Sequence, residues 1–210
     1  MNLSGEALAA LAERVRRKAG DRLVLGIVGP PGAGKSTLAE RLRDQLNESG
    51  DVAVVAPMDG FHRSNGDLDA IGARARKGEP ETFDAERYVE ALRQVRGRER
   101  VEWPTFSRVI DEPVPGGVVI DGESIVITEG NYLLLDEGPW KDVRGLLDEA
   151  WFVDVPDEIL VPRLLERFLA GGRSREKAEA KITRSDLRNA ALVRATRDRA
   201  DLVLGGFVSG

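Results

Sequence analysis

The sequence predicts an α/β fold of three layers, in which helices cover both faces of a central, mainly parallel sheet. Apolar runs at residues 22–28, 52–56 and 124–130 are typical of buried strands. Helical patterns lie between these runs, as in strand–helix–strand units with parallel strands. A glycine-rich turn joins the first run to its helix. The length of 210 residues suits a single domain, 1–210.

The glycine-rich turn fits the phosphate-binding pattern of Gly, four residues, Gly-Lys, then Ser or Thr. Its backbone N–H groups and the helix N-terminus behind it suit an anion. Lys35 is expected to reach the terminal phosphates of a nucleotide, and the Ser36 hydroxyl to bind Mg²⁺. The predicted nucleotide contacts are Gly29, Pro30, Pro31, Gly32, Ala33, Gly34, Lys35, Ser36 and Thr37. Because a strand precedes the loop and a helix follows it, the P-loop NTPase fold is favoured over a simple turn.

The elements next to the loop follow from apolar spacing. Residues 4–19 predict an amphipathic helix that Ser4 can cap, with no chemistry of its own. The helix after the loop carries Leu38, Leu42 and Leu46 on one face, which we expect to pack on the sheet.

The second strand ends shortly before Asp59. In open parallel sheets, ligands bind beyond the carboxyl ends of the strands, so Asp59 is expected near Lys35 and Ser36. There it can accept a proton from a substrate hydroxyl or bind Mg²⁺ through water, although Asp-Gly is also a common turn pair. His62, the only histidine, is either structural or a ligand contact.

The third strand ends in an acid, Glu129, as a Walker B strand does. The alternative is an acid that merely improves solubility. The predicted Mg²⁺ ligands are therefore Ser36, Glu129 and Asp59.

The segments between the second and third strands are less regular. The predicted elements are a helix over 67–77, a helix over 85–95 capped by Asp84, and short strands at 101–103 and 118–120. The stretch 104–113 is predicted to be a long loop, and loops of this length tend to be functional.

The last part of the chain is strongly basic. It predicts a strand at 151–155, a helix from Asp157 as cap to Leu169, a break at Gly171-Gly172, basic helices over 174–199 and a strand at 201–204. Residues 163–199 hold eleven Lys and Arg against five Asp and Glu, a balance of +6 in a chain of net charge −5. This segment suits an anion such as nucleotide phosphates, and the alternative is a solvated helical face. We expect it to form a helical lid.

Composition narrows the partners. The net charge argues against general nucleic-acid binding, and no apolar run approaches the roughly 20 residues of a membrane span. The absence of cysteine excludes disulfides and thiolate chemistry. We expect a cytoplasmic protein with neither nucleic-acid nor membrane partners, and the sequence leaves a homodimer open.

Several motifs together resemble the phosphoribulokinase/uridine kinase family of P-loop kinases, above all its bacterial nucleoside, fructose and pantothenate kinase-like members. Besides the P-loop they are Met58-Asp-Gly-Phe-His62, Pro80-Glu-Thr-Phe-Asp84, Trp103-Pro-Thr-Phe-Ser-Arg108, Thr128-Glu-Gly-Asn-Tyr-Leu-Leu-Leu135, and the arginines from Arg163 to Arg173 followed by Asn189-Ala-Ala-Leu-Val193. The resemblance covers nearly the whole chain.

The resemblance implies a role for several side chains. Asp59 would be the catalytic base, Glu129 would help to hold Mg²⁺, and Arg167 and Arg173 would close over the phosphates. The implied acceptor pocket is Phe61, His62, Phe83, Arg108 and Tyr132. This chain has Ser107 where related sequences often have Asp, which leaves the identity of the acceptor open.

The sequence thus predicts an ATP- and Mg²⁺-dependent kinase that phosphorylates a hydroxyl of a small metabolite. A nucleoside such as uridine ranks first, because aromatic and hydrogen-bonding groups both line the predicted pocket. Pantothenate and a sugar such as fructose are the alternatives. A nucleotide-dependent switch is the competing class, but no switch-like Gln or Thr and no guanine-reading Asn-Lys-x-Asp run is present.

Overall fold

Five parallel strands form the central sheet of the computed structural model, which describes residues 4–205. In chain order they are β1 (Leu23–Val28), β2 (Ala53–Pro57), β5 (Ile125–Gly130), β6 (Glu149–Asp154) and β7 (Leu202–Gly205). In space the order is β2-β5-β1-β6-β7, and each neighbouring pair is parallel. The β1 side chains alternate between the two faces, since Leu25 and Ile27 join one hydrophobic core while Val24 and Val28 join the other.

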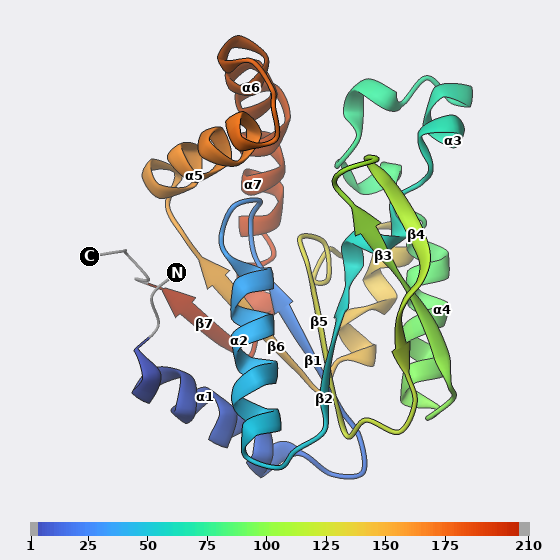
Figure 1. Ribbon diagram of the computed structural model, residues 1–210, viewed down its shortest axis with the longest axis vertical. Coiled ribbons are helices and arrows are strands. Elements are labelled where there is room, and N and C mark those ends of the chain that lie inside the picture. The colour runs from blue at the N-terminus through green and yellow to red at the C-terminus, as the bar shows by residue number, and fades with distance from the viewer. Residues whose placement is uncertain (1–3, 206–210) are drawn as a thin grey trace.

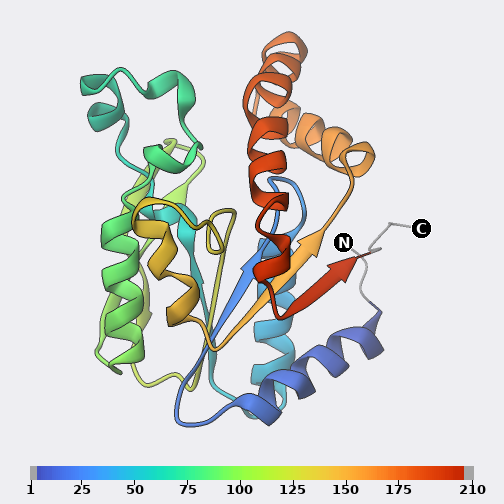
Figure 2. The ribbon, with the colours of Figure 1, turned by 180° about the vertical axis from the view of Figure 1, so that it is seen from behind.

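Helices cover both faces, which confirms the predicted three-layer fold (Figures 1 and 2). On one face, α1 (Gly5–Lys18) packs through Leu8 and Leu11, and α2 (Lys35–Glu48) packs through the leucines of its predicted face. On the other lie α4 (Ala85–Arg96) and the short helical turns of residues 138–146. No helix within residues 4–205 is both long and apolar enough to cross a membrane.

Two groups of elements extend past the carboxyl edge of the sheet. One contains α5 (Asp157–Ala170), α6 (Arg175–Lys181), a π-helical turn (Ile182–Asp186) and α7 (Leu187–Arg194). Opposite it in Figure 1 are α3 (Asn65–Ala70) and the tip of an antiparallel hairpin, β3 (Val101–Ser107) and β4 (Glu112–Ile120). Most of the strongly basic stretch 163–199 belongs to the first group. We call residues 163–199 the lid segment.

Three details of the predicted elements are wrong. The predicted loop 104–113 is mostly strand, because pairing of Thr105, Phe106 and Ser107 with β4 leaves a turn of residues 108–111. The predicted helix 67–77 is the short α3 with a separate helical turn at Arg74–Arg76. Asp157 does not cap α5; Pro156 occupies the cap position, and the Asp157 carboxylate accepts from Arg194 instead.

Gly60 fixes the approach of the Asp59 turn to the β3–β4 hairpin. A Cβ at Gly60 would lie 1.9 Å from the Pro104 carbonyl oxygen. Because that atom belongs to the backbone, we expect Gly60→Ala to lower the free energy of unfolding by about 1–3 kcal/mol, the usual range for overpacking. Urea titration measures the change.

Gly66→Ala is the matched control, because the nearest atom to a Cβ at that position in α3 is 3.8 Å away. We expect it to alter the free energy of unfolding by less than about 0.5 kcal/mol. Equal stabilities of the two variants would contradict the close approach at Gly60.

Candidate active site

Three adjacent strand ends place the predicted phosphate-binding and acidic groups together. Glu129 is the penultimate residue of β5 and pairs in register with Ile27 of β1 and Pro57 of β2. The glycine-rich loop continues from β1, and Asp59 follows β2. The structure therefore brings the cation of the loop and the two carboxylates to one edge of the sheet, as parallel pairing requires.

The glycine-rich loop wraps the N-terminus of α2. Gly32 and Gly34 have φ values of 81° and 92°, which side chains disfavour, and Gly34 directly precedes α2. Lys35 Nζ donates to the Pro30 carbonyl at 3.0 Å and to Asn131 Oδ1 at 2.7 Å. Burial lowers the pKa of Lys35, while the charges of Glu129 and Asp59 oppose that effect. Replacing these neutral partners by phosphate oxygens would favour the charged amine.

Ser36 and Glu129 supply oxygen ligands suited to Mg²⁺. Ser36 Oγ donates to Glu129 Oε1 at 2.9 Å. Glu129 is 6% exposed, and burial together with the charge of Asp59 raises its pKa to about 7, against the opposing charge of Lys35. No cluster of three or more His, Cys, Asp or Glu that could hold a metal occurs within residues 4–205. The Ser36 hydroxyl and the Glu129 carboxylate fit Mg²⁺, because this ion is commonly held by one or two carboxylates together with substrate phosphates.

An aromatic wall lies beside Asp59. The His62 ring is 3.9 Å from the Phe83 ring and 4.7 Å from the Phe106 ring, between centroids. His62 Nδ1 lies 2.8 Å from the Asp59 carbonyl oxygen, so this nitrogen carries the donated proton and leaves Nε2 as an acceptor. All three rings and Arg108 line the same cavity of about 1100 Å³ as Asp59 and Lys35.

Two of the predicted acceptor contacts do not line that cavity. Phe61 is 2% exposed and packs edge-on against Tyr88 and Trp103, at 5.1 and 4.9 Å between ring centroids. Tyr132 is 1% exposed, and its hydroxyl donates to the Gly78 carbonyl at 2.5 Å. Tyr132 supports the wall by packing edge-on against Phe83 at 5.6 Å between ring centroids, whereas Phe61 belongs to the hydrophobic core.

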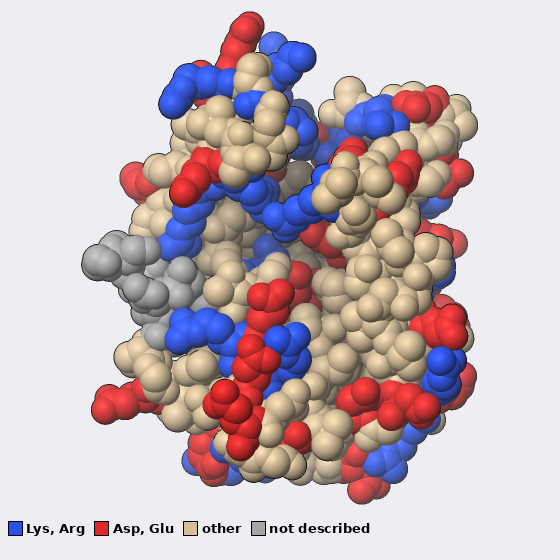
Figure 3. Space-filling model, in the orientation of Figure 1, with Lys and Arg blue, Asp and Glu red and all other residues tan. Residues whose placement is uncertain are grey.

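The lid segment closes the other side of the cavity. The guanidinium groups of Arg167 and Arg173 lie over the Phe168 ring at 5.4 and 4.9 Å, and Arg163 also lines the cavity. Burial and the nearby charge of Arg108 lower the pKa of Arg167. Lys and Arg side chains gather around the hollow between the lid segment and the α3 side of the molecule (Figure 3). These cations suit the phosphates of a nucleotide.

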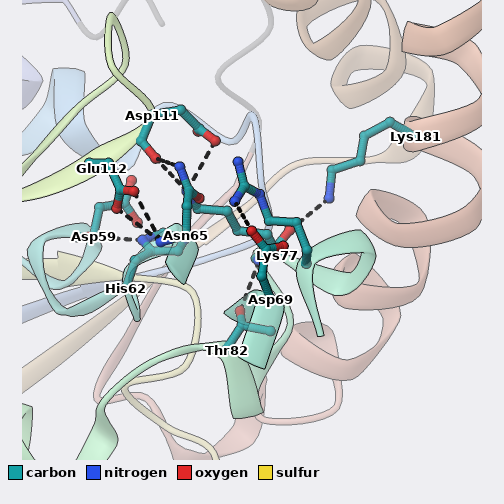
Figure 4. Close-up of polar contacts among 11 residues, drawn as sticks. Asp59, His62, Asn65, Asp69, Lys77, Thr82, Asp111, Glu112 and Lys181 are labelled. Atoms are coloured by element: carbon teal, nitrogen blue, oxygen red, sulfur yellow. Dashed lines mark hydrogen bonds and ion pairs between the residues drawn. The ribbon is translucent and has the colours of Figure 1, made fainter. Parts of the chain in front are cut away.

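Several residues that line the cavity were not predicted as site residues, among them Lys77, Asn131, Lys181, Asp186 and Asn189. Lys77 Nζ donates to Asn65 Oδ1 at 2.6 Å and to the Asp111 carbonyl at 2.5 Å, which ties the segment after Asp59 to the hairpin turn (Figure 4). Asn131 follows the Walker B acid in one of the quoted motifs, so its position was a usable signal. Asn189 likewise begins a quoted motif, whereas Lys77, Lys181 and Asp186 belong to none of them.

The single histidine, His62, should make the free energy of unfolding depend on pH near neutrality. Burial lowers the pKa of His62 below its ordinary value of 6.5. The unfolded chain therefore binds the proton first as the pH falls through 6.5, and the folded protein loses stability until His62 itself protonates. We expect this loss to be at most about 1.4 kcal/mol per pH unit.

The variant His62→Gln removes the titrating imidazole, and with it this pH dependence of stability, while its amide side chain still occupies the space of the ring. Urea unfolding of both proteins between pH 5 and 8 checks the expectation. The stability of the wild type should fall relative to the variant below pH 6.5, and a constant difference over the whole range would contradict it.

Comparison with known proteins places this geometry among kinases. Residues 24–207 match the model of the phosphoribulokinase/uridine kinase family. The uncharacterized protein YggC of Escherichia coli K12 is 39% identical over 186 residues, which cover 87% of this chain and 77% of YggC. A Schizosaccharomyces pombe protein provisionally named uridine kinase C227.14 is 34% identical, over 87% of this chain and 83% of its own. A crystal structure from Silicibacter sp. TM1040, provisionally described as a fructose transport system kinase, matches with a TM-score of 0.88 at 36% identity, over 97% of this chain and 100% of that one.

Proposed function

This chain belongs to the phosphoribulokinase/uridine kinase family and is a P-loop small-molecule kinase, and we propose that it transfers the γ-phosphate of ATP to a hydroxyl of a nucleoside such as uridine. The observation that carries the proposal is the single cavity that holds Lys35, the Ser36–Glu129 pair and Asp59 beside an aromatic wall.

Each group has a place in the transfer. The loop N–H groups and Lys35 bind the β- and γ-phosphates, and Arg167 and Arg173 neutralise charge on the transferred group. Asp59 orients the acceptor hydroxyl and takes its proton as the new phosphate bond forms. Mg²⁺ held by Ser36 and Glu129, with Asp59 as a ligand through water, would supply a Lewis acid for the phosphate oxygens. Phosphoryl transfer depends mainly on such positioning and charge neutralisation.

The aromatic wall favours a flat acceptor group. His62 and Phe83 or Phe106 offer ring faces to a base, while Asp59 and Arg108 suit hydroxyls. The provisional name of the fission yeast relative supports the same choice. Pantothenate, whose carboxylate can meet Arg108, and fructose remain the alternative acceptors.

One coupled assay tests the proposal, with ATP, Mg²⁺ and in turn uridine, cytidine, pantothenate, fructose and ribulose 5-phosphate. Sites built to hydrogen-bond a substrate reject analogues that lack those groups by about 10⁴-fold, so a sharp preference for a nucleoside is expected. Turnover of pantothenate or fructose alone would overturn the nucleoside and leave the kinase intact. Full-rate ATP hydrolysis without any acceptor would instead favour the switch-like NTPase.

The lid segment is expected to change with nucleotide. Its cations Arg163, Arg167 and Arg173 line the cavity, so bound phosphates should draw residues 163–199 inward and order them. Hydrogen exchange with and without a non-hydrolysable ATP analogue measures this. We expect stronger protection of the lid segment in the bound state, with α1 unchanged as an internal control. Equal protection in the two states would argue against a moving lid.

A further inference from the structure

The lid segment carries a buried carboxylate whose hydrogen bonding is incomplete. Asp186, the last residue of the π-helical turn, is 6% exposed and lines the cavity. Its Oδ2 atom makes no hydrogen bond, and Asp186 forms no ion pair within residues 4–205. Burying a carboxylate without partners is costly, so such a group calls for a specific explanation. π-helical turns are also frequent at functional sites.

Helix geometry places Asp186 on the side of the lid segment that faces the cavity and residues 77–78. Asn189 follows it by three residues, which puts both on one helical face, and Asn189 Nδ2 donates to the Gly78 carbonyl at 3.1 Å. Earlier in the same segment, Lys181 Nζ donates to the Lys77 carbonyl at 2.9 Å (Figure 4). The helical run from α6 to α7 therefore packs on the segment that continues from Asp59 and His62.

The lining of the cavity gives the same placement. Asp186 and Asn189 line the same cavity as Asp59 and Phe83. The Gly78 carbonyl that accepts from Asn189 also accepts from the Tyr132 hydroxyl, and the Tyr132 ring packs edge-on against Phe83 at 5.6 Å between centroids. Asp186 therefore lies one helical turn from a residue that contacts the aromatic side of the cavity.

The sign of the charge limits what Asp186 can bind. A carboxylate repels phosphates, so its partner must be a hydrogen-bond donor. Burial raises the pKa of Asp186, and the charges of Lys181, Arg167 and Arg173 oppose that effect, although none of the three forms an ion pair with it in the described part of the chain. Arg163 Nη2 is likewise buried without a partner. The lid segment therefore presents an unsatisfied cation suited to phosphate and an unsatisfied anion suited to a hydroxyl.

We propose that Asp186 binds the acceptor, its carboxylate accepting a hydrogen bond from a hydroxyl other than the one that is phosphorylated. The acceptor then carries at least two hydroxyls, one at Asp59 and one at Asp186, as a ribose or another polyol does. This inference rests on the proposed kinase function and adds a contact from the lid. It makes acceptor binding and lid position interdependent.

Calorimetric binding separates this inference from the kinase reaction, because no turnover is needed. Wild type, Asp186→Asn and the control Glu176→Gln are titrated with uridine and with D-fructose, in the presence of Mg²⁺ and a non-hydrolysable ATP analogue. Glu176 is an exposed lid carboxylate that does not line the cavity. We expect Asp186→Asn to weaken the affinity for the polyol about 10- to 100-fold, as for a lost hydrogen bond to a charged group. The affinity for the ATP analogue should change less than about twofold.

Deoxy analogues identify the contact without relying on the variant. With uridine the probes are 2′- and 3′-deoxyuridine, and with D-fructose its monodeoxy analogues. One analogue should bind wild type more weakly than its parent, and Asp186→Asn should not distinguish the two. Unchanged polyol binding in Asp186→Asn would overturn the inference, as would wild type binding neither polyol. An equal loss of affinity for the ATP analogue would assign Asp186 to positioning the lid arginines instead. Polyol binding with no phosphoryl transfer would contradict the proposed function alone.

Discussion

Replacing Asp59 by Asn is expected to lower kcat by about 10²- to 10⁴-fold, the range for loss of a positioned general base. The amide keeps the size of the side chain but cannot take the proton of the acceptor hydroxyl. Because His62 Nδ1 bonds the Asp59 main-chain carbonyl rather than its carboxylate, the aromatic wall should stay in place. The KM for the acceptor should therefore change far less than kcat.

Steady-state kinetics with the best acceptor measure this effect. Asp198→Asn is the control, because Asp198 is an exposed carboxylate outside the cavity. Wild-type turnover in Asp59→Asn would show that this carboxylate is not the base. A rise in the acceptor KM with kcat preserved would show that it binds the acceptor without transferring a proton.

Lys35→Met is expected to reduce kcat by about 10²- to 10³-fold, as for other preorganised groups that stabilise transition-state charge. Methionine fills the space of the buried Lys35 side chain but carries no charge to neutralise the phosphates. The change also removes the cation that opposes the raised pKa of Glu129, so Glu129 should remain protonated to higher pH. Both effects weaken binding of ATP with Mg²⁺.

The control for the second prediction is Lys141→Met, since Lys141 is exposed and does not line the cavity. Kinetics at pH 7 and pH 8.5 separate the two effects of Lys35→Met. Activity that recovers with pH would implicate Glu129 protonation. Activity close to wild type at both values would exclude Lys35 from the transfer.

The strands of the central sheet and the groups at its carboxyl edge were predictable from the sequence. The glycine-rich loop, its strand and its helix form one continuous stretch, so spacing alone identified Lys35 and Ser36. Asp59 and Glu129 are far apart in the chain, but both end buried strands. The carboxyl ends of parallel strands share one edge, so their proximity to the loop followed without any knowledge of the packing.

The walls of the cavity depended on contacts between distant segments. Phe61 and Phe83 occur in similar motifs, yet only Phe83 lines the cavity, because Phe61 packs against Tyr88 and Trp103 from other elements. Phe106 reaches the site only because pairing of β3 with β4 turns an apparently irregular loop into a hairpin.

By itself, the sequence determined a P-loop kinase with its phosphate-binding loop, its two carboxylates and a strongly basic segment at 163–199. The tertiary structure alone decided which side chains line the cavity, and Asp186 shows why. In the sequence it is one of five acids among eleven basic residues of the lid segment, with nothing to separate it from an exposed acid such as Glu176. Its burial depends on the packing of the lid helices against residues 77–78, more than a hundred positions earlier in the chain. Spacing along a helix cannot specify such a long-range contact.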